Sequence, residues 1–147
     1  MRLLIFAFLL ACLVACREEE QYSPVPALTE LTCSVMATDE DLDDPANDRY
    51  RATFQWRYLD GDQDLDAEGA ILRWWIDDVE QTPQSLFEAS LGLTGRISLN
   101  AEPLMPFELY VFRISVVDAA GNESNVLNAD VDTDAITCSI PGAAARP

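Results

Sequence analysis

Carboxylates occupy every second position of one segment that could bind a hard cation. They are Asp60, Asp62, Asp64, Asp66 and Glu68. Calcium prefers oxygen ligands, and a loop can bring several of them around one ion. The segment is not an EF-hand loop, because Leu65 stands where the turn glycine belongs and Ile71 where the bidentate glutamate belongs. We therefore predict either an irregular calcium site or a solvated loop that charge repulsion keeps open.

A catalytic centre is not predicted from the remaining polar residues. The chain contains no histidine, and every basic residue is arginine. The commonest general base, the commonest metal ligand and lysine-based covalent chemistry are therefore missing. Carboxylates are plentiful, but their positions single out no acid and base pair. We expect a protein that is not an enzyme.

A tryptophan pair in the segment 70–77 offers a second candidate site. Adjacent strand residues point to opposite faces, so Trp74 and Trp75 cannot both lie in the core. If Leu72, Trp74 and Ile76 face inward, Trp75 lies outside beside Arg73. An exposed tryptophan can stack on a sugar ring or contact a protein. Alternatively, arginine stems or a loop cover it.

Strand patterns supply the elements that must position these residues. In 50–58, aromatic and small apolar residues alternate with polar ones, which predicts a half-buried strand. Further strands are predicted around 28–35, 70–77, 85–91, 96–99, 107–117, 126 and 131–138, separated by turn-forming residues. No helical period is apparent. The sequence thus predicts an all-β protein, an antiparallel sandwich of about seven strands.

The N-terminus has the pattern of an export signal. Arg2 is followed by an apolar stretch that ends in Leu13-Val14-Ala15-Cys16. This segment resembles the lipobox of bacterial lipoproteins, which implies cleavage after residue 15 and a lipid on Cys16. The stretch is too short to span a membrane, which takes about 20 apolar residues. Leu9-Leu10-Ala11-Cys12 is a second candidate lipobox.

Cysteine parity favours lipidation of Cys16. Choosing Cys12 would leave an odd number of cysteines in an oxidising compartment, whereas choosing Cys16 leaves Cys33 and Cys138, which can form a disulfide. The expected organisation is a signal peptide (1–15), a lipidated N-terminus and tether (16–27), one sandwich domain (28–140) and a tail (141–147). The formal net charge of −17 argues against binding nucleic acid.

A longer motif lies in the second half of the chain. Leu104, Pro106 and Tyr110 have the spacing of the tyrosine corner of fibronectin type III domains, and the following residues to Asn122 resemble that family's next strand and turn. Trp56 similarly resembles the family's core tryptophan. The resemblance implies an immunoglobulin-like sandwich over residues 28–135. The cysteine pair and the acidic segment 60–68 depart from the family pattern.

These observations lead to a functional expectation. We expect a secreted protein, held by the lipid on Cys16 at the outer membrane or cell surface, that acts as a protein-interaction or adhesion module. Two alternatives are a carbohydrate-binding module that uses Trp75 and Arg73, with calcium on the acidic loop, and a structural envelope component without a discrete ligand. No cofactor other than calcium is expected.

Overall fold

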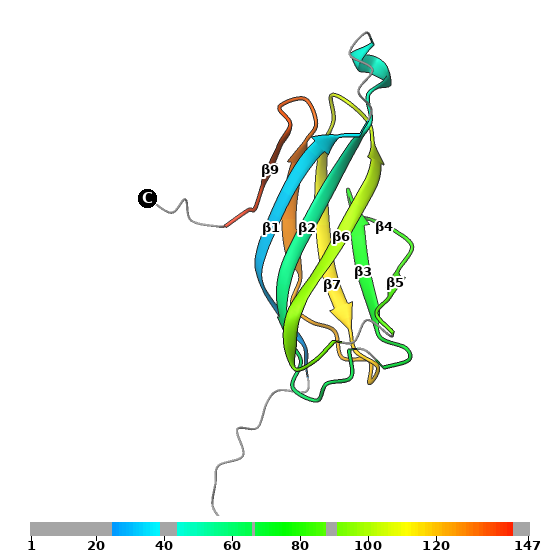
Figure 1. Ribbon diagram of the computed structural model, residues 1–147, viewed down its shortest axis with the longest axis vertical. Helices are drawn as coiled ribbons and strands as arrows, with labels where there is room; N and C mark the ends of the chain where they lie inside the picture. The colour runs from blue at the N-terminus through cyan, green and yellow to red at the C-terminus, as the bar shows by residue number, and fades with distance from the viewer. Residues whose placement is uncertain (1–24, 39–43, 66, 88–90, 143–147) are drawn as a thin grey trace, which may run out of the picture.

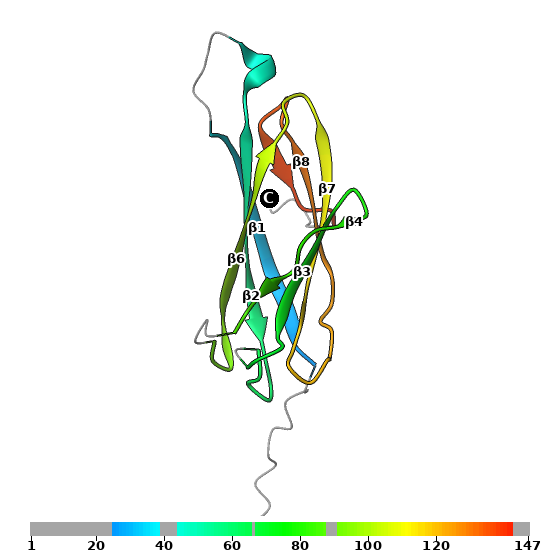
Figure 2. The same cartoon turned by 90° about the vertical axis from the view of Figure 1, so that its right-hand side faces the viewer.

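Two antiparallel β-sheets form the protein, which confirms the all-β prediction. The computed structural model describes residues 25–38, 44–65, 67–87 and 91–142. The first sheet has the order β1-β2-β6, and the second has the order β4-β3-β7-β8-β9 with β5 paired to β3 (Figures 1 and 2). The strands are β1 (Ala27–Ala37), β2 (Tyr50–Leu59), β3 (Ile71–Ile76), β4 (Val79–Glu80), β5 (Gln84–Ser85), β6 (Thr94–Leu104), β7 (Leu109–Val117), β8 (Leu127–Asp132) and β9 (Thr137–Ser139). Within the described ranges, the one helical element is a short 3-10 turn, η1 (Pro45–Asn47).

The two ends of the sandwich carry different loops. The entry end, where β1 begins, holds the connections 60–70 and 118–126, and the far end holds the connections 105–108 and 133–136 (Figure 1). At the entry end Ala27 pairs with Leu59, so the acidic loop begins beside the first described strand. Loops at the same end of the sandwich can therefore contact one another, whereas loops at opposite ends cannot.

The core forms where the inward faces of the sheets meet (Figure 2). The alternation predicted for 50–58 is confirmed, because the apolar residues of this segment are buried and its polar residues are partly or fully exposed. Phe54 of the first sheet contacts Phe112 of the second at a ring-centroid distance of 4.7 Å. Trp56 is buried as predicted, and Tyr110 is half-buried at the edge of the core.

A bulge in β1 lets both of its flanking apolar residues face inward. The register with β2 shifts between Thr29 and Thr32, and Glu30 has a positive φ of 52°. The extra residue places Leu28 and Leu31 on the same face, although they are three positions apart and a regular strand would point them to opposite faces. The alternation read from the sequence alone did not include this bulge.

Some predicted strand limits are wrong. The strand expected over 85–91 does not extend past Ser85 in the described part, because Leu86 and Phe87 lie outside the ladder. The strand expected over 96–99 is much longer and runs to Leu104 as an edge strand. An edge position leaves one side of the backbone unpaired, so Pro103 is tolerated there. The described chain has nine strands, of which β4 and β5 have two residues each, whereas about seven were predicted.

Cys33 and Cys138 form a disulfide, as predicted, and this disulfide joins the two sheets. Cys33 lies on β1 and Cys138 on β9, and their Cα atoms are 5.9 Å apart. The predicted signal peptide (1–15), the lipidation residue Cys16 and most of the tether lie outside the described residues. Over the ranges that are described, no helix is long and apolar enough to cross a membrane.

Candidate functional sites

The acidic loop is held against the sandwich by an apolar anchor. Asp60 follows β2 directly, and its backbone N–H donates to the carbonyl of Leu93 at 2.8 Å. Leu65, in the middle of the loop, is fully buried. Its burial turns the chain back towards the sandwich, so the residues before it must curve around a short arc. The aspartates of this arc are thereby brought close together.

Three carboxylates converge in this arc. One carboxylate oxygen from each of Asp60, Asp62 and Asp64 lies within 4.8 Å of the other two. Asp60 is buried at 1% exposure, whereas Asp62 is exposed to solvent. The cluster is therefore buried on the side of Asp60 and open to water on the side of Asp62.

Backbone amides hold two of these carboxylates in place. Oδ2 of Asp60 accepts a hydrogen bond from the N–H of Leu65 at 3.0 Å, and Oδ2 of Asp64 accepts one from the N–H of Ala120 at 3.1 Å. In both residues the Oδ1 atom is buried and accepts no hydrogen bond from the described residues. The second bond links the acidic loop to the β7–β8 connection, which lies far away in sequence.

The environment raises the pKa of both carboxyl groups. For Asp60 the main cause is burial, which outweighs the opposing effect of the hydrogen bond from the N–H of Leu65, and the nearby Asp62 and Asp64 raise the pKa further. For Asp64 burial again comes first, followed by the charge of Asp118 and then that of Asp62. Burial and the neighbouring negative charges disfavour the ionised form, whereas the backbone hydrogen bonds from Leu65 and Ala120 favour it. The loop thus concentrates negative charge that the neighbouring protein groups do not neutralise.

The cluster differs in part from the predicted ligand set. Asp60, Asp62 and Asp64 lie together, the side chain of Asp66 lies outside the described residues, and Glu68 is exposed and is not among the converging carboxylates. Asp118 was not predicted. It is buried in the adjacent turn, where Asn122 donates to it from the backbone N–H at 2.6 Å and from Nδ2 at 2.8 Å. The only sequence signal for Asp118 was its position at the start of a turn.

The second candidate site, Trp75, is engaged by arginines of the same chain. The guanidinium carbon of Arg73 lies 4.8 Å from the ring centroid and that of Arg113 lies 5.2 Å from it, which is the distance range of cation–π contacts. Trp74 points the other way, packs against the core and donates from Nε1 to the carbonyl of Thr82 at 3.1 Å. The predicted division of the tryptophan pair is confirmed, and the covering arginines match the alternative that stems shield Trp75.

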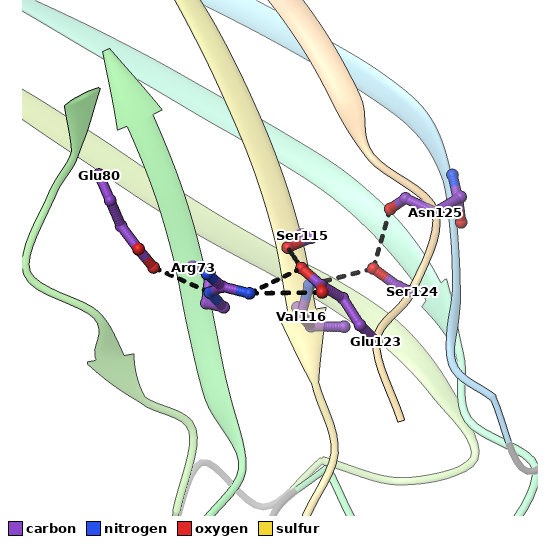
Figure 3. Close-up of polar contacts among 7 residues, drawn as sticks. All are labelled: Arg73, Glu80, Ser115, Val116, Glu123, Ser124 and Asn125. Atoms are coloured by element: carbon purple, nitrogen blue, oxygen red, sulfur yellow. Dashed lines mark hydrogen bonds and ion pairs between the residues drawn. The ribbon is translucent and has the colours of Figure 1, made fainter. Parts of the chain in front are cut away.

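Carboxylates fix both arginines in turn. Arg73 donates to Glu80 at 2.8 Å and to Glu123 at 3.3 Å, and Arg113 donates to Asp78 at 2.7 Å. Glu123 also accepts a hydrogen bond from Ser115 at 2.7 Å, so the network connects β3 and β7 to the β7–β8 connection (Figure 3). The hydrogen bond from Arg73 lowers the pKa of Glu80. The outer face around Trp75 is therefore an internally paired network.

The far end carries an apolar surface that the sequence did not single out. Phe107 is 62% exposed and Ile136 is 51% exposed. Both have positive φ, 58° and 51°, which is unusual for an aromatic or β-branched residue. Leu109 and Val111, which follow Phe107 in the chain on β7, are also exposed. We call Phe107, Ile136, Leu109 and Val111 the apolar end.

Buried polar contacts fix the two loops of the apolar end together. Thr133 is buried, and its Oγ1 accepts from the N–H of Glu108 at 2.9 Å and lies 2.9 Å from the carbonyl of Met105. The N–H of Thr133 also donates to the carbonyl of Glu108 at 3.0 Å. Phe107 lies in the chain between Met105 and Glu108, both of which contact Thr133. The loop around Phe107 and the turn that contains Ile136 therefore form one connected structure.

Comparisons with protein-family models, with curated proteins and with solved structures found no match.

Proposed function

We propose that this protein is a non-catalytic, lipid-anchored module of the bacterial cell envelope that binds another protein through its apolar end. The observation that carries the proposal is the pair of exposed apolar residues, Phe107 and Ile136, with positive φ on two connected loops. Backbone strain of this kind costs about 1–3 kcal/mol per residue and concentrates at ligand-contacting positions. Exposed apolar groups on a fixed support are typical of a protein contact.

The sandwich is proposed to be of fibronectin type III kind. Tyr110 accepts a hydrogen bond from the backbone N–H of Met105 at 2.9 Å, which is the contact that a tyrosine corner makes. Leu104 and Pro106 of the same motif are buried. The buried Trp56 and the two antiparallel sheets agree with this assignment.

The proposed anchor and the apolar end lie at opposite ends of the domain. Lipidation of Cys16 rests on the segment Leu13–Cys16, which precedes the described residues. The chain enters the sandwich at the entry end, whereas Phe107 and Ile136 belong to the connections at the far end (Figure 1). A lipid at the N-terminus would therefore leave the apolar end directed away from the membrane.

The charge around the apolar end indicates the chemistry of the partner. Leu109 pairs with Asp132 and Val111 with Asp130, so carboxylates lie beside the apolar side chains. Glu108 and Asp134 add two exposed carboxylates on the loops. None of these four acids forms an ion pair with a described residue. A partner segment that combines basic and apolar side chains would complement this surface.

Site-specific photocrosslinking in living cells tests the proposal. A photoreactive phenylalanine analogue is placed at Phe107 and, as the matched control, at Val126, an exposed apolar residue of the entry end. We expect one discrete protein adduct from position 107, lost when Ile136 is replaced by Asp, and none from position 126. Equal adduct patterns at both positions, or none at 107, would contradict the proposal.

The anchor is tested separately. Cys16→Ser should move the protein from the membrane fraction to the soluble fraction, and mass spectrometry of the wild type should show a lipid on Cys16. An unmodified Cys16 in membrane-bound protein would contradict the lipid anchor without affecting the crosslinking result.

A further inference from the structure

Asp60 carries a buried carboxylate for which the described chain supplies no counter-charge. Its side chain is 1% exposed, and Oδ1 is buried and accepts no hydrogen bond within the described ranges. The ion pairs between described residues all use carboxylates outside the acidic loop, namely Glu30, Asp78, Glu80, Glu102 and Glu123. Burying a charged group is unfavourable unless it is paired. A cation from solvent would supply the missing counter-charge.

From this geometry we propose that Asp60, Asp62 and Asp64 bind one calcium ion at the entry end of the sandwich. An oxygen of each carboxylate lies within 4.8 Å of the others, so one ion can contact all three. The exposed side chain of Asp62 leaves a route from solvent. Backbone carbonyls and water would supply the remaining ligands, as in other calcium loops.

The donor set favours calcium over other metals. All three side chains offer hard oxygen atoms, and the chain has no histidine, so zinc and other transition metals lack their preferred nitrogen ligands. Calcium accepts irregular geometries with six to eight ligands, whereas magnesium demands a near-ideal octahedron and keeps much of its water. Three carboxylates on an irregular arc fit the less demanding ion.

A bound ion would stabilise the packing of two connections at the entry end. Asp64 already accepts a hydrogen bond from Ala120, and Asp118 of the same turn is close enough to raise the pKa of Asp64. Without a cation, the charges of the loop and the turn repel each other. Asn125 of that connection bonds to both the N–H and the carbonyl of Leu28, at 2.8 and 2.9 Å, where β1 begins. Calcium would therefore stiffen the end at which the chain enters the domain.

The test compares thermal unfolding and calorimetric binding in calcium, in magnesium and in chelator. It uses the full-length protein, purified in detergent with its disulfide intact. The first variant is Asp62→Asn, which removes a charge from an exposed side chain. The matched control is Asp134→Asn, an exposed aspartate of the far end. Calcium is taken to about 10 mM, above the dissociation constants of about 10⁻⁴–10⁻³ M that are typical of extracellular calcium modules.

We expect one calcium ion per chain and a rise in the midpoint temperature. At a concentration 100 times the dissociation constant, the rise should be on the order of 10 °C. Asp62→Asn should weaken binding by at least about tenfold. In chelator the same variant should unfold at or above the wild-type temperature, because it relieves charge repulsion. Asp134→Asn should behave as the wild type under all conditions.

Three results would overturn the proposal. They are no calcium-dependent shift or heat of binding, an equal response to magnesium, and unaltered calcium affinity of Asp62→Asn. A metal site predicts that the wild type unfolds at a higher temperature than Asp62→Asn in calcium but not in chelator. A merely structural loop would give the same order of unfolding temperatures in both conditions. None of these results depends on the proposed protein partner, which is tested at the other end of the domain.

Discussion

The hydroxyl oxygen of Tyr110 accepts a hydrogen bond from the backbone N–H of Met105, five residues earlier, at 2.9 Å. This contact ties the connection between β6 and β7 to the strand that follows it. The residues between the two partners include Phe107, the aromatic residue of the apolar end that has a positive φ. The conformation of the proposed binding surface therefore depends on a hydrogen bond at its base.

Replacing Tyr110 by Phe should lower the free energy of unfolding by about 1 kcal/mol, because one hydrogen bond is lost while the ring remains. Urea denaturation measures the change. The matched control is Tyr50→Phe, since the hydroxyl of Tyr50 makes no hydrogen bond with the described residues. Equal effects of the two substitutions would show that the Met105 contact contributes nothing specific.

Relieving strain at the apolar end should stabilise the domain. Ile136 is a β-branched residue at a φ of 51°, a conformation that asparagine adopts more readily. Ile136→Asn should therefore raise the free energy of unfolding by about 0.5–1 kcal/mol and, at the same time, reduce crosslinking from position 107. Val126→Asn, at an exposed apolar position without positive φ, should change stability by less than about 0.5 kcal/mol. A destabilised Ile136→Asn would mean that this side chain makes stabilising contacts.

The disulfide should contribute strongly to stability. Cys33 and Cys138 are separated by 105 residues, and the chain-entropy relation gives roughly 4–5 kcal/mol as an upper value for a loop of this size. The double variant Cys33→Ala, Cys138→Ala should unfold at a correspondingly lower urea concentration. Reductant should shift the wild type towards the double variant and leave the variant unchanged. A wild type insensitive to complete reduction would contradict this prediction.

The Arg73 network should be visible in an NMR titration of Glu80. The hydrogen bond from Arg73 lowers the pKa of Glu80 below its usual value of 4.5, so the pairing favours the folded state above pH 4.5 and is lost as the pH falls through the lowered pKa. In Arg73→Gln the pKa of Glu80 should return towards 4.5. The stability difference between wild type and variant should shrink as the solution is acidified through this range. Arg96→Gln, at an exposed arginine of β6, is the control and should leave Glu80 unchanged.

Local sequence patterns determined much of the fold. The alternation of apolar and polar residues in 50–58 predicted a central strand and its buried face, because a strand exposes successive side chains to opposite sides. The same rule predicted that Trp74 and Trp75 face opposite ways. The disulfide was predicted from the cysteine count that remains if residues 1–15 are removed as a signal peptide and Cys16 carries a lipid. Each of these inferences needs only neighbouring residues or a parity argument.

Tertiary structure alone decided which distant residues meet. The bulge at Glu30 depends on pairing with β2, and the shared surface of Phe107 and Ile136 depends on Thr133 bridging two loops. The acidic loop was evident as a sequence, but its contact with Ala120 and the neighbouring charge of Asp118 arise only when β2 and β7 end at the same end of the sandwich. Such contacts join residues far apart in the chain, so no local period encodes them. They are decided by how the two sheets pack.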